Sequence, residues 1–198
     1  MTEDNKNRLK VYSTLGSSNH SHKQRASLDY YATDPQAVEM LLELENFCPR
    51  IWEPACGEGH ITEVLKNHGY SVFSSDLIDR GVNDKTFDFL HTDMGQWDGD
   101  IITNPPYSLA VEFIEKSLQS IPDGRKVAMF LKLQFLEGKK RKEFFKKYPP
   151  VVVYVSASRI RCYRNGMKPT KGNDSAVAYC WYIWIKGYSG EPVIRWFN

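Results

Sequence analysis

The fold of this chain is decided by one stretch, Ile51-Trp52-Glu53-Pro54-Ala55-Cys56-Gly57-Glu58-Gly59, in which a short apolar segment runs into a glycine-rich turn. A helical pattern follows it, with an apolar face at Ile61, Val64 and Leu65 and with Gly69 after its end. Glycines at a strand-to-helix turn let the backbone come close to a ligand, and the first N–H groups of the helix can face an anion. The stretch therefore predicts one strand–turn–helix unit with a ligand site at its turn.

Strands and helices are expected to alternate along the rest of the chain. Further strands are predicted at residues 70–75, 101–103, 127–133, 151–155 and 176–185. A short third strand is predicted to lead to Asp93. One helix is predicted to begin at Pro35, capped by Thr33 or Asp34, and another to be capped by Ser108. This alternation indicates an α/β fold with a parallel sheet.

Length and composition are those of one domain. The chain has 198 residues, which is enough for a hydrophobic core of its own. Residues 1–28 lack periodicity and are expected to form a flexible tail, while residues 29–198 are expected to form the domain. The four cysteines make no CxxC pair, so neither a metal site nor a disulfide framework is indicated. The chain shows no signal-peptide pattern and no apolar run near the ~20 residues of a membrane span, so a cytoplasmic location is expected.

Charge is divided unevenly between the two halves of the chain. Residues 29–104 contain 15 acidic and 4 basic residues, whereas residues 125–171 contain 14 basic and 2 acidic ones. A basic helix is predicted over residues 139–147. Such a division can mark a nucleic-acid-binding face, although runs of lysine also cover ordinary solvated helices.

A set of polar residues at predicted strand ends indicates a nucleoside site. Asp76 lies nineteen residues after Gly57, at the end of the next strand, where a carboxylate can accept hydrogen bonds from ribose hydroxyls. Thr62 occupies the third position of the GxGxxG fingerprint, so a pyrophosphate ligand is less expected than a nucleoside. Because the carboxyl ends of parallel strands share one edge of the sheet, four polar residues should converge there: Glu53, Asp76, Asp93 and Asn104.

The sharpest motif is Asn104-Pro105-Pro106-Tyr107, directly after an apolar strand. With this motif and the glycine-rich turn, residues 29 to about 185 resemble the amino-methyltransferases that carry an NPPY motif, and especially the small phage-type DNA N6-adenine methyltransferases. The resemblance implies a Rossmann-like fold with a seven-stranded, mostly parallel sheet, an antiparallel last strand and helices on both faces. It also implies S-adenosyl-L-methionine as the cofactor.

The resemblance assigns roles to residues of this sequence. The cofactor-binding residues that it implies include Tyr31 and Thr33, which belong to a segment that closes over the methionine end. The others are Glu53, Pro54, Ala55, Cys56, Gly57, Gly59, Asp76, Leu77, Asp93, Met94 and Asn104. The catalytic residues that it implies are Asn104, Pro105, Pro106 and Tyr107.

The chemistry of an aromatic amine explains the catalytic motif. The lone pair of such an amine is delocalised into the ring, which makes the nitrogen a poor nucleophile. The side-chain oxygen of Asn104 and the carbonyl of Pro105 can each accept one amino hydrogen, and the prolines stiffen the loop. Tyr107 offers a flat face for the base, so positioning and electrostatics can supply most of the rate without a catalytic base or metal.

DNA is the expected substrate, and a duplex target has to be flipped out of the stack. Tyr163 is nominated to cover the second face of the flipped base, with a surface role as the equally weighted alternative. Sequence readout has to come from the tail, from residues 134–138, from the basic helix or from the loop at 156–174, because no separate large recognition domain is expected. The predicted nucleic-acid-binding residues are Lys139, Lys140, Arg141, Lys142, Arg159, Arg161 and Tyr163.

Three other functions stay open from the sequence. The NPPY motif also suits methylation of adenine or guanine in RNA and of glutamine in protein. A non-enzymatic nucleic-acid-binding module with a vestigial cofactor fold is a second possibility, against which the intact Asn104, Tyr107 and Asp76 count. A small-molecule methyltransferase is a third, which the basic second half makes less attractive.

Overall fold

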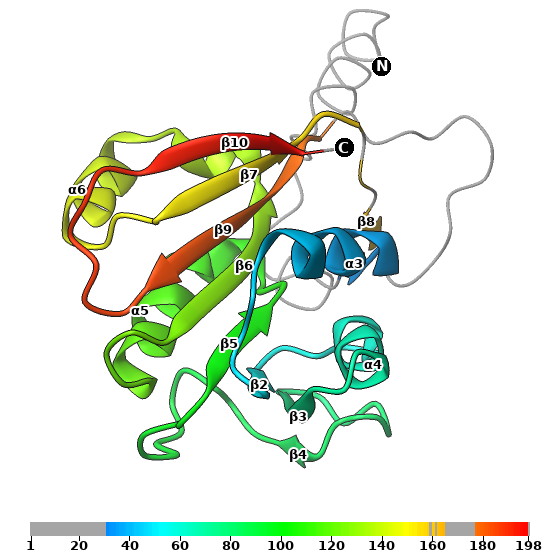
Figure 1. Ribbon diagram of the computed structural model, residues 1–198. Helices are drawn as coiled ribbons and strands as arrows, with labels where there is room; N and C mark the ends of the chain where they lie inside the picture. The colour runs from blue at the N-terminus through cyan, green and yellow to red at the C-terminus, as the bar shows by residue number, and fades with distance from the viewer. Residues whose placement is uncertain (1–30, 159, 161, 165–176, 198) are drawn as a thin grey trace, which may run out of the picture.

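An eight-stranded sheet forms the centre of the computed structural model, which describes residues 31–158, 160, 162–164 and 177–197 (Figure 1). The strand order is β10-β7-β9-β6-β5-β2-β3-β4. Its strands are β2 (Arg50–Glu53), β3 (Ser71–Asp76), β4 (Lys85–Thr86), β5 (Asp100–Thr103), β6 (Lys126–Lys132), β7 (Val152–Ser156), β9 (Tyr179–Ile185) and β10 (Val193–Phe197). All neighbouring pairs are parallel except those of β9, which runs antiparallel between β6 and β7.

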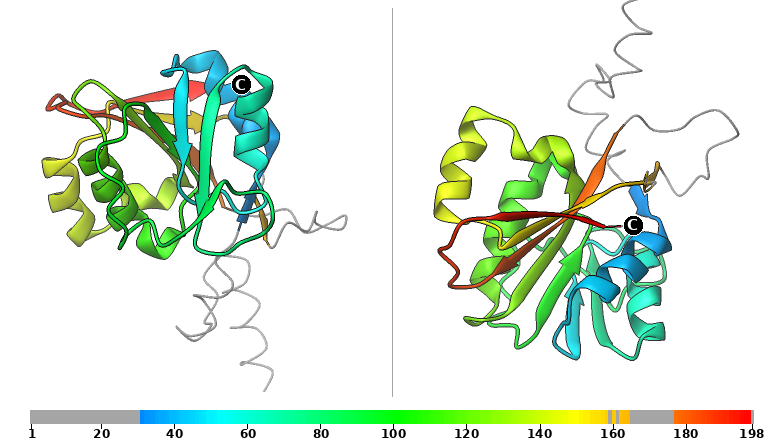
Figure 2. Two further views of the ribbon diagram at one scale, coloured as in Figure 1. Left: turned by 90° about the horizontal axis from the view of Figure 1, so that it is seen from below. Right: turned by 45° about the horizontal axis from the view of Figure 1, so that its top comes forward.

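Helices cover both faces of this sheet (Figure 2). The helices are α3 (Pro35–Leu44), α4 (His60–Asn67), α5 (Ala110–Ser120) and α6 (Lys139–Lys147), with short 3-10 turns η1 (Tyr107–Leu109) and η2 (Leu133–Leu136). On one face, α3 and α4 pack against Phe130 and Trp181; on the other, α5 and α6 pack against Met129 and Tyr182. Burial on both faces explains why β6 and β9 read as continuous apolar runs rather than alternating ones.

A separate two-stranded ribbon lies outside the main sheet. Its strands are β1 (Tyr31–Thr33) and β8 (Cys162–Arg164), which pair antiparallel with Ala32 opposite Tyr163. Neither strand was expected from the sequence, because three residues are too few to show a period. The ribbon joins the segment before α3 to a segment about 130 residues later in the chain.

The predicted elements agree with the structure to within three residues, with three corrections. First, β10 is an eighth strand, parallel to β7, so the antiparallel strand is not the last one. Its residues Val193, Ile194 and Trp196 are exposed by 47%, 48% and 71%, and an edge strand without a buried face has no alternating pattern to detect.

Second, the third strand does not reach Asp93. It ends at Thr86, and Asp93 lies in a later turn, where its carboxylate accepts the N–H of Gly95 at 2.9 Å. Third, Ser108 does not cap α5: it lies inside η1, and Leu109 is the N-cap without a side-chain hydrogen bond. The expected cap of α3 is Asp34, whose side chain accepts the N–H of Gln36 at 3.0 Å.

The described part of the chain has no helix that is both long and apolar enough to span a bilayer. The predicted tail at residues 1–28 lies outside the described residues.

Candidate functional site

The edge at which the parallel strands end carries most of the predicted site. Glu53 is the last residue of β2, Asp76 is the last residue of β3, and Asn104 follows the last residue of β5. Because β3, β2 and β5 are parallel neighbours, their carboxyl ends share one edge of the sheet. The structure therefore brings these three predicted residues together, whereas Asp93 does not stand at a strand end.

The glycine-rich turn after β2 folds back onto the end of β3. The N–H of Cys56 donates to the carbonyl of Ser75 at 3.0 Å, and the N–H of Gly57 donates to Oδ2 of Asp76 at 2.8 Å. Gly57 and Gly59 have φ values of 55° and 81°, in the left-handed region that favours glycine. Pro54 and Ala55 lead from β2 into this turn, so the predicted cofactor loop has the backbone shape that its glycines indicated.

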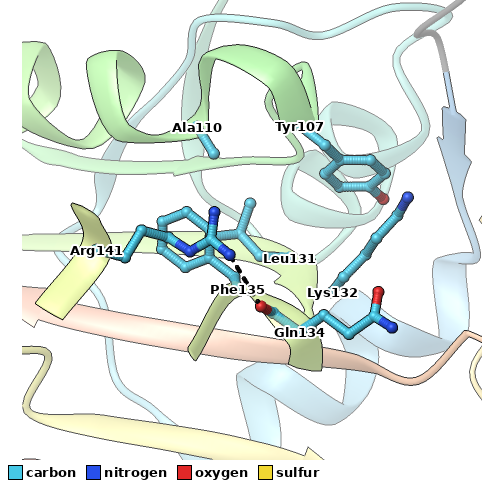
Figure 3. A pocket seen from close by; sticks show the side chains of 7 residues that line it. All are labelled: Tyr107, Ala110, Leu131, Lys132, Gln134, Phe135 and Arg141. Carbon is cyan, nitrogen blue, oxygen red and sulfur yellow. Dashed lines mark hydrogen bonds between the residues drawn. The ribbon is translucent and has the colours of Figure 1, made fainter. Parts of the chain in front are cut away.

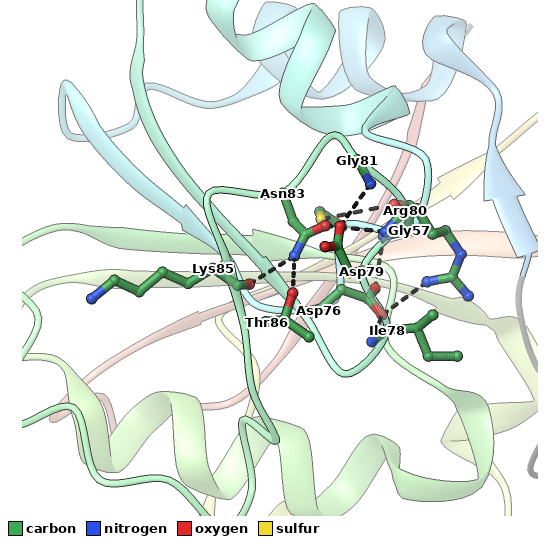
Figure 4. A network of polar contacts seen from close by, with 10 residues as sticks. Gly57, Asp76, Ile78, Asp79, Arg80, Gly81, Asn83, Lys85 and Thr86 are labelled. Carbon is green, nitrogen blue, oxygen red and sulfur yellow. Dashed lines mark hydrogen bonds and ion pairs between the residues drawn. The ribbon is translucent and has the colours of Figure 1, made fainter.

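Asp76 is the centre of a polar network at the end of β3 (Figure 4). Its Oδ1 accepts the N–H of Ile78 at 2.9 Å and also pairs with Nη1 of Arg80 at 2.9 Å. Its side chain is only 13% exposed. The carboxylate is thus held in a fixed orientation, and Arg80 occupies an oxygen that the hydroxyl of a ribose would need.

Exposed apolar side chains follow this carboxylate in the chain. Leu77 and Ile78, directly after Asp76, are 66% and 53% exposed, and Val82 is 46% exposed. Met94, the other predicted apolar contact, is 43% exposed. A carboxylate beside exposed apolar side chains matches a nucleoside, which has a polar sugar and an apolar base face.

Asp88 takes the strand-end position that was predicted for Asp93. It lies two residues after β4, where its carboxylate accepts the N–H of Leu90 at 2.9 Å and pairs with Nδ1 of His91 at 2.8 Å. The hydrogen bond from His91 lowers the pKa of Asp88. The next residue, Phe89, is buried edge-on against Trp52. In the sequence, the signal for this position was an acid followed by an aromatic residue, Asp88-Phe89, shortly after a β-type segment. It was overlooked because the third strand was expected to continue to Asp93.

Glu53 is a buried acid beneath the turn. It is 1% exposed, its carboxylate accepts the hydroxyl of Thr62, and burial raises its pKa to about 8. Burial also raises the pKa of the Cys56 thiol to about 12, with a contribution from the negative charge of Glu53. A thiol that stays protonated at neutral pH is a poor nucleophile, so Cys56 is a packing residue of the turn.

Asn104 is held by the outer ribbon. Its Nδ2 donates to the carbonyl of Tyr31 and to Oγ1 of Thr33, both at 3.0 Å. A carbonyl can only accept, so the amide nitrogen has to face β1 and the side-chain oxygen has to face the other way. The two residues predicted for the methionine end of the cofactor therefore fix the orientation of the Asn104 side chain.

The ring of Tyr107 is partly buried and packs against two other aromatic side chains. Its centroid lies 5.4 Å from that of Tyr31 and 5.9 Å from that of Tyr179, and Nζ of Lys132 lies 4.8 Å from it. Lys132 is the last residue of β6, so it reaches the same edge of the sheet. In the sequence, Lys132 is a single lysine near the end of an otherwise apolar predicted strand. This could have marked it as a site residue, but it was not predicted.

The predicted nucleic-acid-binding residues separate into two groups. Lys139, Lys140 and Lys142 are exposed on the first turn of α6, whereas Arg141 is partly buried. The other three predicted contacts cannot be placed: Arg159 and Arg161 lie outside the described residues, and so does the side chain of Tyr163.

A cavity of about 190 Å³ opens beside Tyr107 (Figure 3). Its polar lining comes from Lys132, Gln134 and Arg141. Its apolar lining comes from the start of α5, from β6 and from η2, through Ala110, Leu131 and Phe135. The cavity therefore lies between the catalytic loop and the start of the basic helix.

Comparison with known proteins identifies the fold. No protein-family model matches the sequence, and no curated protein matches it. Over 96% of this chain and 71% of the other, the structure is similar to a provisionally assigned class I S-adenosylmethionine-dependent methyltransferase from Listeria monocytogenes, with a TM-score of 0.59 and 13% identity. The chain has the class I methyltransferase fold.

Two further solved structures are similar to this chain. One is a provisionally assigned RNA methyltransferase from Pyrococcus horikoshii, with a TM-score of 0.57, 15% identity, and coverage of 80% of this chain and 87% of the other. The other is the modification subunit of a provisionally assigned type I restriction enzyme from Vibrio vulnificus, with a TM-score of 0.57, 13% identity, and coverage of 85% and 47%. Within this fold, the glycine-rich turn and Asp76 lie at the same end of the sheet as the NPPY loop.

The pairing of Arg80 with Asp76 predicts opposite effects of two substitutions on cofactor affinity. Arg80→Ala frees Oδ1 of Asp76 and should tighten S-adenosylmethionine binding by roughly fivefold, the equivalent of about 1 kcal/mol for a partly exposed ion pair. Asp76→Ala removes the acceptor and loosens the turn at Gly57, so it should weaken binding. Isothermal titration calorimetry measures both. Weaker binding by Arg80→Ala would show that Arg80 itself holds the ligand.

The raised pKa of Glu53 predicts a stability that falls with pH. Between pH 4.5 and about 8, the folded chain keeps the Glu53 proton and the unfolded chain loses it. Unfolding then releases a proton, so this group lowers the free energy of unfolding by about 1.4 kcal/mol per pH unit across that window. Glu53→Gln should therefore be more stable than the wild type at pH 8, with the gain vanishing towards pH 4.5.

Urea unfolding at intervals from pH 5 to pH 8 measures this difference. Glu63→Gln, on the exposed face of α4, is the matched control and should show no such trend. A Glu53→Gln difference that stays constant with pH would mean that Glu53 is ionised in the folded protein.

Proposed function

We propose that this chain is an S-adenosylmethionine-dependent methyltransferase that acts on an exocyclic amino nitrogen, and that the nitrogen is N6 of adenine in DNA. The observation that carries the proposal is the Asn104 amide, whose nitrogen is bound by Tyr31 and Thr33 so that its oxygen faces away from β1. An oxygen held in this way is an acceptor for an amino hydrogen, in the loop directly after β5.

The residues at the strand ends fit the cofactor. Asp76 would accept hydrogen bonds from the ribose hydroxyls, and Leu77 and Ile78 would cover the apolar face of the adenine. Asp88, two residues after β4, is the acid that we assign to the amino group of that adenine, in place of Asp93. The left-handed glycines of the turn keep side chains away from the sugar. This donor set suits a nucleoside with a hydrophobic base face.

The chain's own groups would activate the target amine by position. The Asn104 oxygen and the Pro105 carbonyl each accept one amino hydrogen, which favours a pyramidal nitrogen with its lone pair directed outwards. When bound, S-adenosylmethionine would supply an electrophilic methyl group on a cationic sulfonium, whose sulfur would keep the C–S electron pair and leave as a neutral thioether, while the methylated nitrogen would release a proton to water. Because a neutral amine can attack this cationic donor before it loses its proton, the transfer would need no strong base.

Two features favour a nucleic acid as the carrier of the amine. The basic first turn of α6 lies next to the cavity beside Tyr107, so cations for phosphates and a recess for one base are adjacent. The similar structures include both a restriction-modification subunit and an RNA methyltransferase at the same TM-score, so the choice of DNA rests on the resemblance of the NPPY motif. A base in a duplex has to leave the stack to reach the Asn104 oxygen.

The proposed reaction is tested by incubating the protein with bacterial genomic DNA, total RNA and a protein extract, each with methyl-labelled S-adenosylmethionine. Label in DNA, recovered as N6-methyladenine at a recurring sequence, is the expected result. Asn104→Ala should abolish this label while leaving cofactor affinity nearly intact, because the amide holds the target amine. Label in RNA or protein alone would show that the substrate is not DNA. Full activity of Asn104→Ala would contradict the role of Asn104 in binding the target amine.

The basic turn of α6 predicts a salt dependence of DNA binding. If Lys139, Lys140 and Lys142 bind phosphates, replacing all three by Ala should lower affinity and flatten the slope of log K against log salt by about 0.9 for each phosphate that is no longer neutralised. Fluorescence anisotropy on one duplex from 50 to 200 mM salt gives the slope. Lys85→Ala, an exposed lysine at the β4 edge of the sheet, is the control. An unchanged slope in the triple variant would place the DNA path elsewhere.

A further inference from the structure

Arg141 differs from the other basic residues of α6. Figure 3 shows its guanidinium reaching from the helix into the middle of the cavity, with Tyr107 and Lys132 on the opposite side. Its neighbours Lys140 and Lys142 are exposed, whereas Arg141 is partly buried. A residue that contacts DNA phosphates would be expected on the exposed face with them.

The contacts of Arg141 hold it in place but leave hydrogen-bonding capacity. Its Cζ lies 5.3 Å from the ring centroid of Phe135, and its Nη2 donates to the backbone carbonyl of Gln134 at a long 3.3 Å. Its Nε is buried and has no hydrogen-bond partner among the described residues. A buried donor without an acceptor is costly, on the order of 1–3 kcal/mol, so the guanidinium keeps hydrogen-bonding capacity that the described residues do not use.

The backbone before α6 leaves room for this side chain. Gly138 has a φ of 125°, and a Cβ built there would lie 3.1 Å from Nη2 of Arg141. A side chain at position 138 would therefore require the guanidinium to shift by a few tenths of an ångström. The glycine lets the guanidinium lie close to the backbone before α6.

The lining of the cavity selects the kind of ligand. Its volume of about 190 Å³ is smaller than the roughly 300–1,000 Å³ of pockets for drug-sized molecules, so it suits a single small ring system. Ala110, Leu131 and Phe135 offer apolar surface, and Arg141 and Lys132 offer only donors. A phosphate would have to lose its water against apolar side chains, whereas a heteroaromatic base has apolar faces and ring nitrogens that accept.

We propose that Arg141 is a specificity-determining residue that donates a hydrogen bond to a ring nitrogen of the target base. The inference rests on the proposed function, because it assigns the cavity to the base whose amine Asn104 holds. For an adenine bound by its N6 amino group, the acceptors next to that group are N1 and N7. Arginine is suited to such an acceptor because its guanidinium is always charged and planar.

The experiment uses duplexes with the mapped target site carrying adenine, 1-deazaadenine or 7-deazaadenine, in which one ring nitrogen is replaced by carbon. For the wild type, one analogue should lower kcat/KM by roughly tenfold, as expected when one hydrogen bond to a base is removed. Arg141→Ala should lower kcat/KM on adenine by a similar factor and should no longer distinguish that analogue from adenine. Arg141→Lys keeps an aliphatic stem over Phe135 and should recover only part of the discrimination.

The matched control is Lys142→Ala, which removes one positive charge from the next residue of α6. It should raise KM through weaker attraction to phosphates, yet keep the wild-type ratio between adenine and analogue. Thermal unfolding of each variant separates a folding defect from a change in recognition, and Arg141→Lys keeps the test open if Arg141→Ala does not fold.

The possible results distinguish this inference from the proposed function. A wild type that methylates adenine in DNA but treats both analogues like adenine overturns the role of Arg141 alone. The same holds if Arg141→Ala keeps the wild-type analogue ratio, which a merely structural contact with Phe135 would produce. A wild type that transfers no methyl group to DNA overturns the proposed function and this inference together.

Discussion

Two hydrogen bonds from one amide organise the site. The Nδ2 atom of Asn104 is bound by the Tyr31 carbonyl and the Thr33 hydroxyl, which come from a strand that is not part of the main sheet. Because β1 also pairs with β8, the orientation of the Asn104 amide depends on segments about 130 residues apart. Without these acceptors the amide could turn, and its oxygen would lose the fixed direction that holding an amine requires.

The sequence predicted the main sheet well because its central strands are buried on both faces, and the helix limits carry clear signals. Pro35, with Asp34 as one of two expected caps, marked the start of α3 correctly, and the glycine-rich turn between β2 and α4 was predicted from its glycines. The strand β10 was missed because its side chains are exposed. Asp88 was missed because β4 has only two residues, too few for any periodicity.

The positions of some site residues were predicted, but their side-chain contacts were not. Side-chain direction does not follow from the spacing of residues in the sequence. Asn104 and Asp76 were placed from the strand ends, which topology fixes. The pairing of Arg80 with Asp76, the packing of Tyr107 under Lys132, and the inward turn of Arg141 all depend on tertiary contacts. From the sequence, the four consecutive basic residues 139–142 were expected to share one exposed surface. In the structure, Arg141 lines the cavity instead.

A crystal structure with S-adenosylhomocysteine, the demethylated cofactor, would show whether this edge of the sheet binds the cofactor through Asp76 with its methyl-bearing end beside Asn104. We expect ribose hydroxyls on the Asp76 carboxylate, Arg80 displaced from Oδ1, and the amino-acid end of the ligand next to the loop that begins at Asn104. Ligand bound elsewhere, or bound here with its amino-acid end directed away from Asn104, would rule out this binding mode.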